Sequence, residues 1–580
     1  MRQRSLRVTA VLVALVVLAG CATIPTSGPV VSEPRQVFNE GQGGITVVPE
    51  PPPQGAPPAT IVRGFLLAMA SFDPTYATAK AYLTADAAKA WQPTSEVLIY
   101  GSGATPQVTG DQVSISALSI GRVSADGSFT GSEETQWKHD FGMVQEDGEW
   151  RISNPPTGLA LSQDAFSSSF KRINAYFFPE SSQVLVPDPR YVQSGAWDRT
   201  RAANLVLAGP SDWLSTIMGE SVFSGISLTG DVTRDPGVAD IPLSDAARSL
   251  SLKEAWQLAV EIAATMRDVT GVTGVRLMVD GTPLTIPGAA PDGSLPISIV
   301  GSYDSSAVGV PQTLAGVAGG VVAQPLVPTP VPVPGDWGET SRTIDSFAMS
   351  QSSPAQIAAV TDEGLLIGPV GGAAPSRTVD LPQLLRPQYD SAGNIWAVSS
   401  ADPAQVSYVT KNGVVPIDTT QLGGMAIRGF QVSPDGRRII LVRQVASGAE
   451  DSPLEVGVAL IGYENGLPAS IGSWQPIRLT WGGVPLNSVI DVAWLGPSSL
   501  LVLGSSGTTA PELFFTDLDG LEIDEWGSPQ NWDPVQMAVN VTSVNTQVYV
   551  LDRGGSIWSY QGSYSWTSAP GPASAIGFPS

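Results

Sequence analysis

Cys21 is the only cysteine in the chain, and its position suggests a chemical use for its thiol. It follows Leu18, Ala19 and Gly20, and two small residues before a cysteine suit a peptidase that binds the backbone closely. The thiol can be alkylated by a lipid before the chain is cleaved after Gly20. With one cysteine no intrachain disulfide can form, so the domains must depend on their packed cores.

The segment before Cys21 has the layout of a secretory signal. Its first seven residues contain three arginines, and residues 8–19 are almost entirely apolar. Twelve residues of helix span roughly 18 Å, well short of the ~30 Å hydrocarbon core, so we do not expect a permanent transmembrane helix. The stretch resembles the bacterial lipobox, and that resemblance implies a diacylglyceryl thioether on Cys21 as the new N-terminus. The alternative is an ordinary signal peptide or signal anchor with a chance cysteine.

His139 is the only histidine, and a Ser-His-Asp hydrolase would need it as the base. The sequence has no G-x-S-x-G nucleophile elbow. Alternation along a strand puts Trp137, His139 and Phe141 on one face and Asp140 on the other, so His139 and Asp140 point apart. We expect a histidine half-buried between two aromatic side chains rather than a general base.

Metal chemistry has few candidate ligands. One histidine and one cysteine committed to a lipid argue against zinc. Residues 517–524 offer several carboxylates for calcium, but the EF-hand spacing is absent, and an Asp-Gly turn between two strands accounts for the same residues. No phosphate-binding glycine loop stands out. We therefore predict no metal, no cofactor and no enzymatic activity.

The composition restricts the partners. Asp and Glu total 53 against 30 Lys and Arg, for a net charge of −23. Such a surface repels phosphate backbones and anionic headgroups, so we exclude nucleic acid and expect the body to stand off the membrane. A chain of 580 residues suggests three or four domains.

Changes in composition divide the chain into segments. Residues 22–59 contain nine prolines in 38 residues, which favours an extended tether over a packed core. The predicted order is a lipoprotein signal peptide (1–20), a Pro/Gly-rich tether (21–59), an α+β domain (60–190), an α/β domain (195–300), a Pro-rich joint (301–343) and an all-β propeller (344–580).

The α+β domain is predicted from helical patterns followed by strand patterns. Residues 61–70 and 76–83 read as helices, and the helical half ends near Trp91. Strand alternations follow at 107–118, 129–143 and 149–152, with a tight hairpin turn at 146–148. Helices before a curved antiparallel sheet resemble the nuclear-transport-factor-2-like (NTF2-like) fold.

The α/β domain is predicted from three elements. Residues 203–208 read as a strand stopped by Gly209-Pro210, and Ser251 can cap a helix that Thr270-Gly271 closes. A strand over 275–281 follows. This combination resembles the GerMN domain of sporulation and envelope proteins.

The last segment repeats short strands around turns, including the S-P-D-G turn at 433–436. The spacing predicts a β-propeller of five blades, with a possible sixth closed by residues 575–578; a β-sandwich is the alternative. Six tryptophans lie in this segment and could form a partner surface, although we expect each to fill the wedges between blades. These are Trp396, Trp494, Trp526, Trp532, Trp558 and Trp566.

The whole chain resembles the LpqB family of envelope lipoproteins from high-GC Gram-positive bacteria. The residues that carry the match are L-A-G-C-A-T-I-P at 18–25, V-R-G-F-L-L-A-M at 62–69, L-A-G-P at 207–210 and V-S-P-D-G-R-R at 432–438. The resemblance implies association with the MtrA–MtrB two-component system and binding to the extracytoplasmic part of its sensor histidine kinase, with effects on cell division and envelope integrity. It carries over no catalytic residues.

We therefore expect a non-catalytic lipoprotein, anchored through Cys21 to the extracytoplasmic face of the cell membrane, that binds and modulates an MtrB-like kinase. Two other interpretations stay open. One is an exported enzyme acting on cell-wall glycan or peptide, which would need two acids about 5 to 10 Å apart in a pocket. The other is a ligand-binding sensor or scaffold.

The lipid anchor makes a direct prediction for the Cys21→Ala variant. Without the thiol no thioether can form, so we expect the protein to leave the membrane fraction on cell fractionation. Persistence of the variant in the membrane fraction would contradict the anchor.

Overall fold

The structure is a computed structural model that describes residues 49–580, except 72, 74, 133–134, 180–181, 195–197, 220, 234–235, 305–311, 380, 425, 445–452, 507–508 and 543–545. Cys21, its cleavage position after Gly20, the signal peptide and most of the tether therefore lie outside the described residues.

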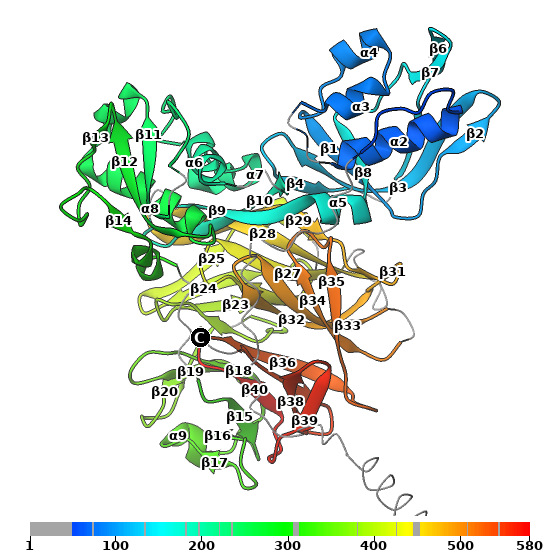
Figure 1. The fold of residues 1–580 in the computed structure, drawn as a ribbon. Helices are drawn as coiled ribbons and strands as arrows, with labels where there is room; N and C mark the ends of the chain where they lie inside the picture. The colour runs from blue at the N-terminus through cyan, green and yellow to red at the C-terminus, as the bar shows by residue number, and fades with distance from the viewer. Residues whose placement is uncertain are drawn as a thin grey trace, which may run out of the picture. The chain divides into compact units, whose positions relative to one another are not determined.

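Helices open the described part of the first domain, as predicted, with a third one, α4, beyond the two predicted ranges (Figure 1). They are α2 (Pro58–Ala70), α3 (Ala77–Ala81) and α4 (Ala85–Ala90). Pro58 suits the first turn of α2 because that turn needs no N–H donor. Ile61, Phe65 and Met69 recur every fourth residue and are fully buried, so α2 packs one face onto the sheet.

The sheet of this domain is centred on the long strand β3 (Gln112–Ser124). Its order is β2-β3-β1-β8, and β4 and β5 also pair with β3. The strands are β1 (Glu96–Tyr100), β2 (Gln107–Thr109), β4 (Phe129–Gly131), β5 (Gln136–Asp140) and β8 (Leu159–Ser162). The α+β class is confirmed, but β8 runs parallel to β1, so the sheet is mixed rather than purely antiparallel.

A hairpin of β6 (Met143–Glu146) and β7 (Glu149–Ile152) completes the domain. Its turn residues Asp147 and Gly148 have φ of 53° and 80°, the left-handed pair that a two-residue hairpin turn requires. The hairpin predicted from this Asp-Gly pair is confirmed.

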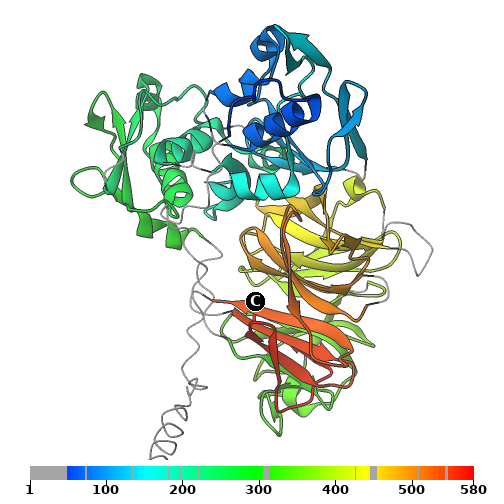
Figure 2. The same cartoon turned by 45° about the vertical axis from the view of Figure 1, so that its right-hand side comes forward.

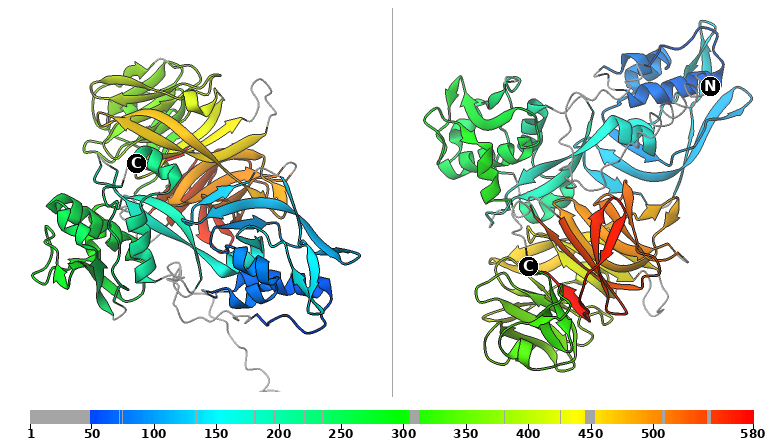
Figure 3. Two further views of the ribbon diagram at one scale, coloured as in Figure 1. Left: turned by 90° about the horizontal axis from the view of Figure 1, so that it is seen from above. Right: turned by 60° about the horizontal axis from the view of Figure 1, so that its bottom comes forward.

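The second domain packs helices against a small sheet (Figure 3). Its order is β11-β12-β13, with β14 also on β12, and β11 and β12 are parallel. The elements are α6 (Arg199–Ala208), α7 (Asp212–Met218), α8 (Leu252–Met266), β11 (Gly237–Leu243), β12 (Val272–Val279), β13 (Thr282–Pro283) and β14 (Leu295–Pro296). The predicted cap is confirmed, because Ser251 and Glu254 form a capping box at the start of α8.

One predicted strand of this domain is wrong. Residues 203–208 belong to helix α6, which begins where the Asp198 carboxylate accepts a hydrogen bond from the N–H of Arg201. Gly209, with φ of 87°, ends the helix as it would have ended a strand. By periodicity alone, the short apolar run fits a helix as well as a strand. The hydrogen bond at the Asp198 cap favours the helix.

The predicted boundary at residue 190 also needs correction. Strands β9 (Phe170–Phe177) and β10 (Val186–Gln193) form a two-stranded sheet whose buried residues join the core of the second domain. Ala175, Tyr176 and Val186 pack there with Leu258 and Ile262 of α8. The second core therefore begins well before residue 195.

The remaining chain forms six four-stranded sheets in the part that the structure describes, each a propeller blade (Figures 1 and 2). The first blade combines β15 (Ala315–Ala318), β16 (Val321–Gln324) and β17 (Val331–Pro332) with β40 (Ala575–Gly577). The second holds β18 (Ile344–Met349), β19 (Gln356–Thr361), β20 (Gly364–Pro369) and β21 (Ser376–Val379). The third holds β22 (Gln388–Tyr389), β23 (Ile395–Val398), β24 (Val406–Thr410) and β25 (Gly413–Ile417).

The last three blades continue the same order. The fourth holds β26 (Ile427–Val432), β27 (Arg438–Gln444), β28 (Leu454–Glu464) and β29 (Leu467–Ile477). The fifth holds β32 (Ser488–Gly496), β33 (Ser499–Ser505), β34 (Glu512–Asp517) and β35 (Ile523–Gly527). The sixth holds β36 (Pro534–Val541), β37 (Thr546–Asp552), β38 (Ile557–Gly562) and β39 (Ser565–Ser568).

The C-terminal strand closes the ring. β40 pairs antiparallel with β15, with Ile576 opposite Gly316, so the chain's end completes the blade that residues 315–332 begin. The propeller and its sixth blade are confirmed, and the β-sandwich alternative is wrong. The Pro-rich joint predicted over 301–343 is also wrong where β15, β16 and β17 lie, because prolines are tolerated in short edge strands such as β17.

Ile576 gives a test of closure. Its side chain is fully buried against Leu551 and Ile557, so we expect Ile576→Ala to lower the free energy of unfolding by about 2–4 kcal/mol. The matched control is Val414→Ala on β25, where 43% exposure predicts a change below about 0.5 kcal/mol. Equal urea midpoints for the two variants would contradict closure by β40.

Candidate functional site

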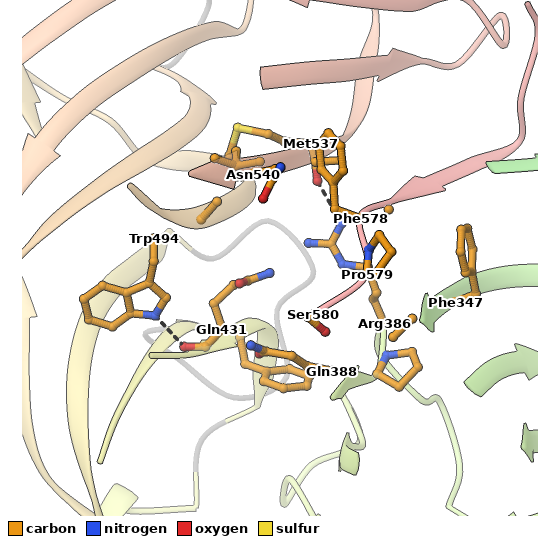
Figure 4. Close-up of a pocket in the computed structure, with 17 residues that line it drawn as sticks. Phe347, Arg386, Gln388, Gln431, Trp494, Met537, Asn540, Phe578, Pro579 and Ser580 are labelled. Atoms are coloured by element: carbon orange, nitrogen blue, oxygen red, sulfur yellow. Dashed lines mark hydrogen bonds between the residues drawn. The ribbon is translucent and has the colours of Figure 1, made fainter. Parts of the chain in front are cut away.

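A pocket of about 130 Å³ lies on the propeller axis (Figure 4). The innermost strands of all six blades reach it, including Phe347 of β18, Gln431 of β26 and Trp494 of β32. Phe578, Pro579 and Ser580, which follow β40, fill its remaining side.

Arg386 is the charged side chain among the described residues that line this pocket, and its charge is compensated. It donates to the Asp491 carboxylate at 3.0 Å and to the Met537 carbonyl at 2.9 Å. Asp491 also accepts the N–H of Met537 at 2.8 Å. Arg386, just before β22, and Asp491 of β32 therefore connect the third, fifth and sixth blades across the axis and are engaged in holding them together.

Two glutamines link adjacent blades in the same way. Gln388 donates to the Val432 carbonyl and accepts the Val432 N–H, at 3.0 and 2.7 Å. Gln536 makes the same pair of bonds with Ile576, at 2.8 and 2.9 Å. Each amide ties one innermost strand to the next, and the second fixes the strand that closes the ring.

The axial pocket offers little for catalysis. The described residues that line it include no Asp, Glu, His or Cys. Its volume is also below the roughly 300–1,000 Å³ typical of small-molecule sites. The axis is therefore a structural centre, and candidate binding groups must be sought elsewhere.

His139 lies where the alternation placed it. Its ring stacks on Trp137 at 5.8 Å and meets Phe141 edge-on at 4.9 Å, and its Nε2 is 2.9 Å from the Asn154 carbonyl oxygen. Burial lowers the pKa of His139, so the ring is neutral at pH 7 and Nε2–H donates to that carbonyl. The prediction of a histidine half-buried between two aromatics is confirmed.

The acidic segment 517–524 is the turn between β34 and β35, as the Asp-Gly interpretation held, with Gly520 at φ of 67°. Its carboxylates face residues of β9 and β10. Arg172 forms an ion pair with Asp517 at 2.5 Å, and the Tyr191 hydroxyl donates to Asp519 at 2.7 Å. Among the described residues no group of three or more His, Cys, Asp or Glu could hold a metal ion.

The same turn also makes apolar contacts with the first domain. Leu521 is 6% exposed and packs in the core of the first domain, and its carbonyl accepts a hydrogen bond from Gln163. Trp213 of α7 donates to the Ser473 carbonyl at 2.6 Å and packs beside Val458 of β28. Strands β28 and β29 of the fourth blade and the β34–β35 turn of the fifth blade thus contact the preceding domains.

The tryptophans divide into two groups. Trp396, Trp494 and Trp532 are 1%, 6% and 6% exposed, which confirms wedge packing for these three. Trp526, Trp558 and Trp566 are only partly buried, on the fifth and sixth blades. The sequence does not distinguish the two groups, because the position of a tryptophan in a strand does not show how close its side chain lies to the outer rim of the propeller.

Two of these tryptophans belong to a group of aromatic side chains on the fifth and sixth blades that we name the aromatic edge: Phe515, Trp526, Tyr560, Tyr564 and Trp566. Trp526 stacks on Tyr560 at 4.7 Å between ring centroids, and Tyr560 meets Trp566 at 5.2 Å. Phe515 stacks on Trp526 at 6.2 Å. Tyr564, in the turn between β38 and β39, is 68% exposed.

Tyr564 occupies a costly backbone conformation. Ser563 and Tyr564 have φ of 49° and 63°, the left-handed pair of a two-residue hairpin turn in which Asn and Gly are preferred. A bulky residue there costs of order 1 kcal/mol, so an exposed tyrosine at this turn points to a use on the surface.

No described helix is both long and apolar enough to cross a bilayer.

Known families match three successive parts of the chain. The description "Lipoprotein LpqB, N-terminal domain" matches residues 51–167, "Sporulation and spore germination" matches 174–285, and "Lipoprotein LpqB beta-propeller domain" matches 320–579. These ranges follow the three cores and their order.

The chain belongs to the LpqB lipoprotein family. Proteins named Lipoprotein LpqB align over nearly their full length: 29% identity with one from Cutibacterium acnes, covering 97% of both chains, 28% with one from Streptomyces avermitilis, covering 90% and 89%, and 25% with one from Mycobacterium bovis, covering 98% of both. Membership makes this an envelope lipoprotein.

Similarity to solved structures is much lower. A puromycin-hydrolysing peptidase of Mycobacterium tuberculosis aligns with a TM-score of 0.31 and 13% identity over 46% of this chain and 47% of its own. At that level its activity cannot be transferred to this family.

The Arg172–Asp517 pair gives a prediction for the contact between the propeller and β9. Their side chains are 16% and 13% exposed, so Arg172→Ala leaves a largely buried carboxylate without its cation. We expect the free energy of unfolding to fall by roughly 2 kcal/mol, less than for a fully buried pair.

The matched control is Arg553→Ala, which breaks an exposed pair with Asp533 at 72% and 63% exposure. That change should stay below about 1 kcal/mol in urea unfolding. If Arg172→Ala costs no more than the control, the pair does not stabilise the contact.

Proposed function

We propose that this protein is held by a lipid on Cys21 at the extracytoplasmic face of the cell membrane, where it binds the extracytoplasmic domain of an MtrB-like sensor histidine kinase and modulates its signalling. Its effects on cell division and envelope homeostasis would follow from that kinase. The observation that carries the binding role is the aromatic edge.

The aromatic edge has the properties of a protein contact surface. Tryptophan and tyrosine are enriched among the residues that contribute most binding energy, since they bury large rigid rings while keeping a polar atom available. Trp526 and Tyr560 are already held by stacking, so they lose little side-chain freedom on binding. The exposed Tyr564 extends the surface at the end of the β38–β39 hairpin.

The tether and the anchor explain how a modest contact could suffice. Residues 21–59 are rich in proline and could extend to about 120 Å at ~3.1 Å per residue. Confinement to the membrane raises the effective concentration of the protein near a membrane kinase. Binding changes signalling only if the surface prefers one kinase state over the other.

The alternative of a glycan-cleaving enzyme requires two carboxyl groups that hold a sugar between them. Glu512 and Glu525 are one close pair among the described residues, since burial, the charge of Glu525 and a hydrogen bond with it raise the pKa of Glu512. Two hydrogen-bonded carboxyls lie too close for a sugar ring to enter between them, against the ~5 Å that a retaining enzyme uses. This pair therefore favours the non-catalytic role.

Tyr564→Asn gives the sharpest test of the aromatic edge. Asparagine removes the exposed ring and accepts the left-handed turn, so we expect affinity for the purified extracytoplasmic kinase domain to fall about tenfold without loss of stability. The measurement is isothermal titration of the kinase domain with the mature, tether-containing protein.

Trp481→Ala is the matched control, since Trp481 is also exposed, at 39%, but lies outside the aromatic edge and contacts Phe514. It should leave the affinity within about twofold. Unchanged affinity in Tyr564→Asn, or equal losses in both variants, would contradict the assigned surface.

A further inference from the structure

A cavity of about 440 Å³ lies in the second domain, between α8, the end of α7 and the segment that follows β9. Its volume falls in the range of roughly 300–1,000 Å³ found for small-molecule sites. Phe177, Phe178, Met218 and Phe223 supply apolar lining, and three of them are aromatic. Pro210 of the L-A-G-P motif and the Ser251 cap also line it, whereas no residue of the aromatic edge does.

Glu261 of α8 lines the cavity and is only 1% exposed. Its Oε1 accepts the N–H of Phe178 at 2.9 Å and the side-chain amide of Gln257 at 3.1 Å. Its Oε2 is buried and has no hydrogen-bond partner in the part of the chain that the structure describes. A buried carboxyl oxygen without a donor is costly, by about 1–3 kcal/mol.

One oxygen of the Glu261 carboxyl group has a structural role in the fold. Glu261 and Thr265, one turn apart on α8, accept the N–H groups of Phe178 and Tyr176 and so dock β9 onto the helix. A neutral glutamine or a threonine would serve that purpose equally well, as Thr265 does. The second oxygen, Oε2, has no part in the docking.

Among the described lining residues, no cation reaches this oxygen. Lys253 is the lysine among the described lining residues, but it is exposed and lies eight residues from Glu261, roughly 12 Å along the helix. Glu254 is the remaining charged lining residue, and its carboxylate is engaged in the capping box with Ser251.

We propose that this cavity binds a small organic amine, with its ammonium group donating to Oε2 of Glu261 and its apolar body lying among the phenylalanine rings. An ammonium supplies both the missing donor and the compensating charge. Aromatic faces around it add a favourable cation–π contribution. The inference stands independently of the kinase interaction.

The acid–base behaviour of Glu261 fits this role and sets the conditions of the test. Burial raises the pKa of Glu261 to about 8, so the empty cavity holds mainly a neutral carboxyl at pH 7. An ammonium ligand needs the ionised form, and binding should therefore strengthen as the pH rises from 6.5 to 8.5. Hydrogen bonds with Ser251 lower the pKa of Glu254, so this second lining carboxyl stays ionised throughout the interval.

The test titrates the mature protein with 2-phenylethylamine, by calorimetry at pH 6.5 and 8.5, and with 2-phenylethanol as a neutral ligand of nearly the same shape. We expect one amine per chain at pH 8.5, at least tenfold weaker binding at pH 6.5, and at least tenfold weaker binding of the alcohol. No amine binding at 10 mM, or equal binding of amine and alcohol, would overturn the proposal.

Two variants locate the site. Glu261→Gln keeps an acceptor for Phe178 and removes the charge, so amine binding should fall at least tenfold while thermal unfolding stays cooperative. Glu254→Gln also removes a carboxylate from the cavity lining and preserves the capping box, so binding should be unchanged. If the Glu261→Gln variant keeps its affinity for the amine, Glu261 is not the group that binds the ammonium, and the proposed site is wrong.

Discussion

The pairing of β40 with β15 is the contact on which the rest of the structure depends. A propeller is stable when every blade has a neighbour on both sides, and this pairing supplies the last neighbour with residues from the chain's end. Gln536 reinforces it by bonding both backbone groups of Ile576, and Gln388 repeats the device between the third and fourth blades. The axial pocket is consequently lined by groups that hold the blades together, and the binding sites that we propose lie on the aromatic edge and in the second domain.

The closed ring in turn holds the loops that meet the preceding domains. Asp517 and Asp519 lie in one turn of the fifth blade and engage Arg172 and Tyr191, while Leu521 from the same turn packs into the first domain's core. Acidic residues that could have suggested calcium thus bind a guanidinium and a hydroxyl. With one cysteine in the chain, no intrachain disulfide contributes, and such contacts carry the stability.

Much of the fold could be predicted because its signals are local. The Asp147-Gly148 and Asp435-Gly436 turns and the Ser251 cap each specify a backbone conformation by residue type. One prediction failed at helix α6, where a short apolar run fits a helix as well as a strand. Another failed in the Pro-rich joint at 301–343, where β15 pairs with the distant strand β40 and so begins the first blade. The sites were harder to predict. Tyr564 and Glu261 are ordinary residues in the sequence, and only the left-handed turn and the unpartnered oxygen distinguish them.

The central claim is that this family member acts by binding a membrane kinase. The most direct measurement is crosslinking in living cells of the full lipidated protein, followed by pull-down and mass spectrometry of what is attached. The account predicts recovery of a sensor kinase through its extracytoplasmic domain, with crosslinks from residues of the fifth and sixth blades. Recovery of cell-wall fragments or wall-synthesis enzymes, with no kinase, would contradict it.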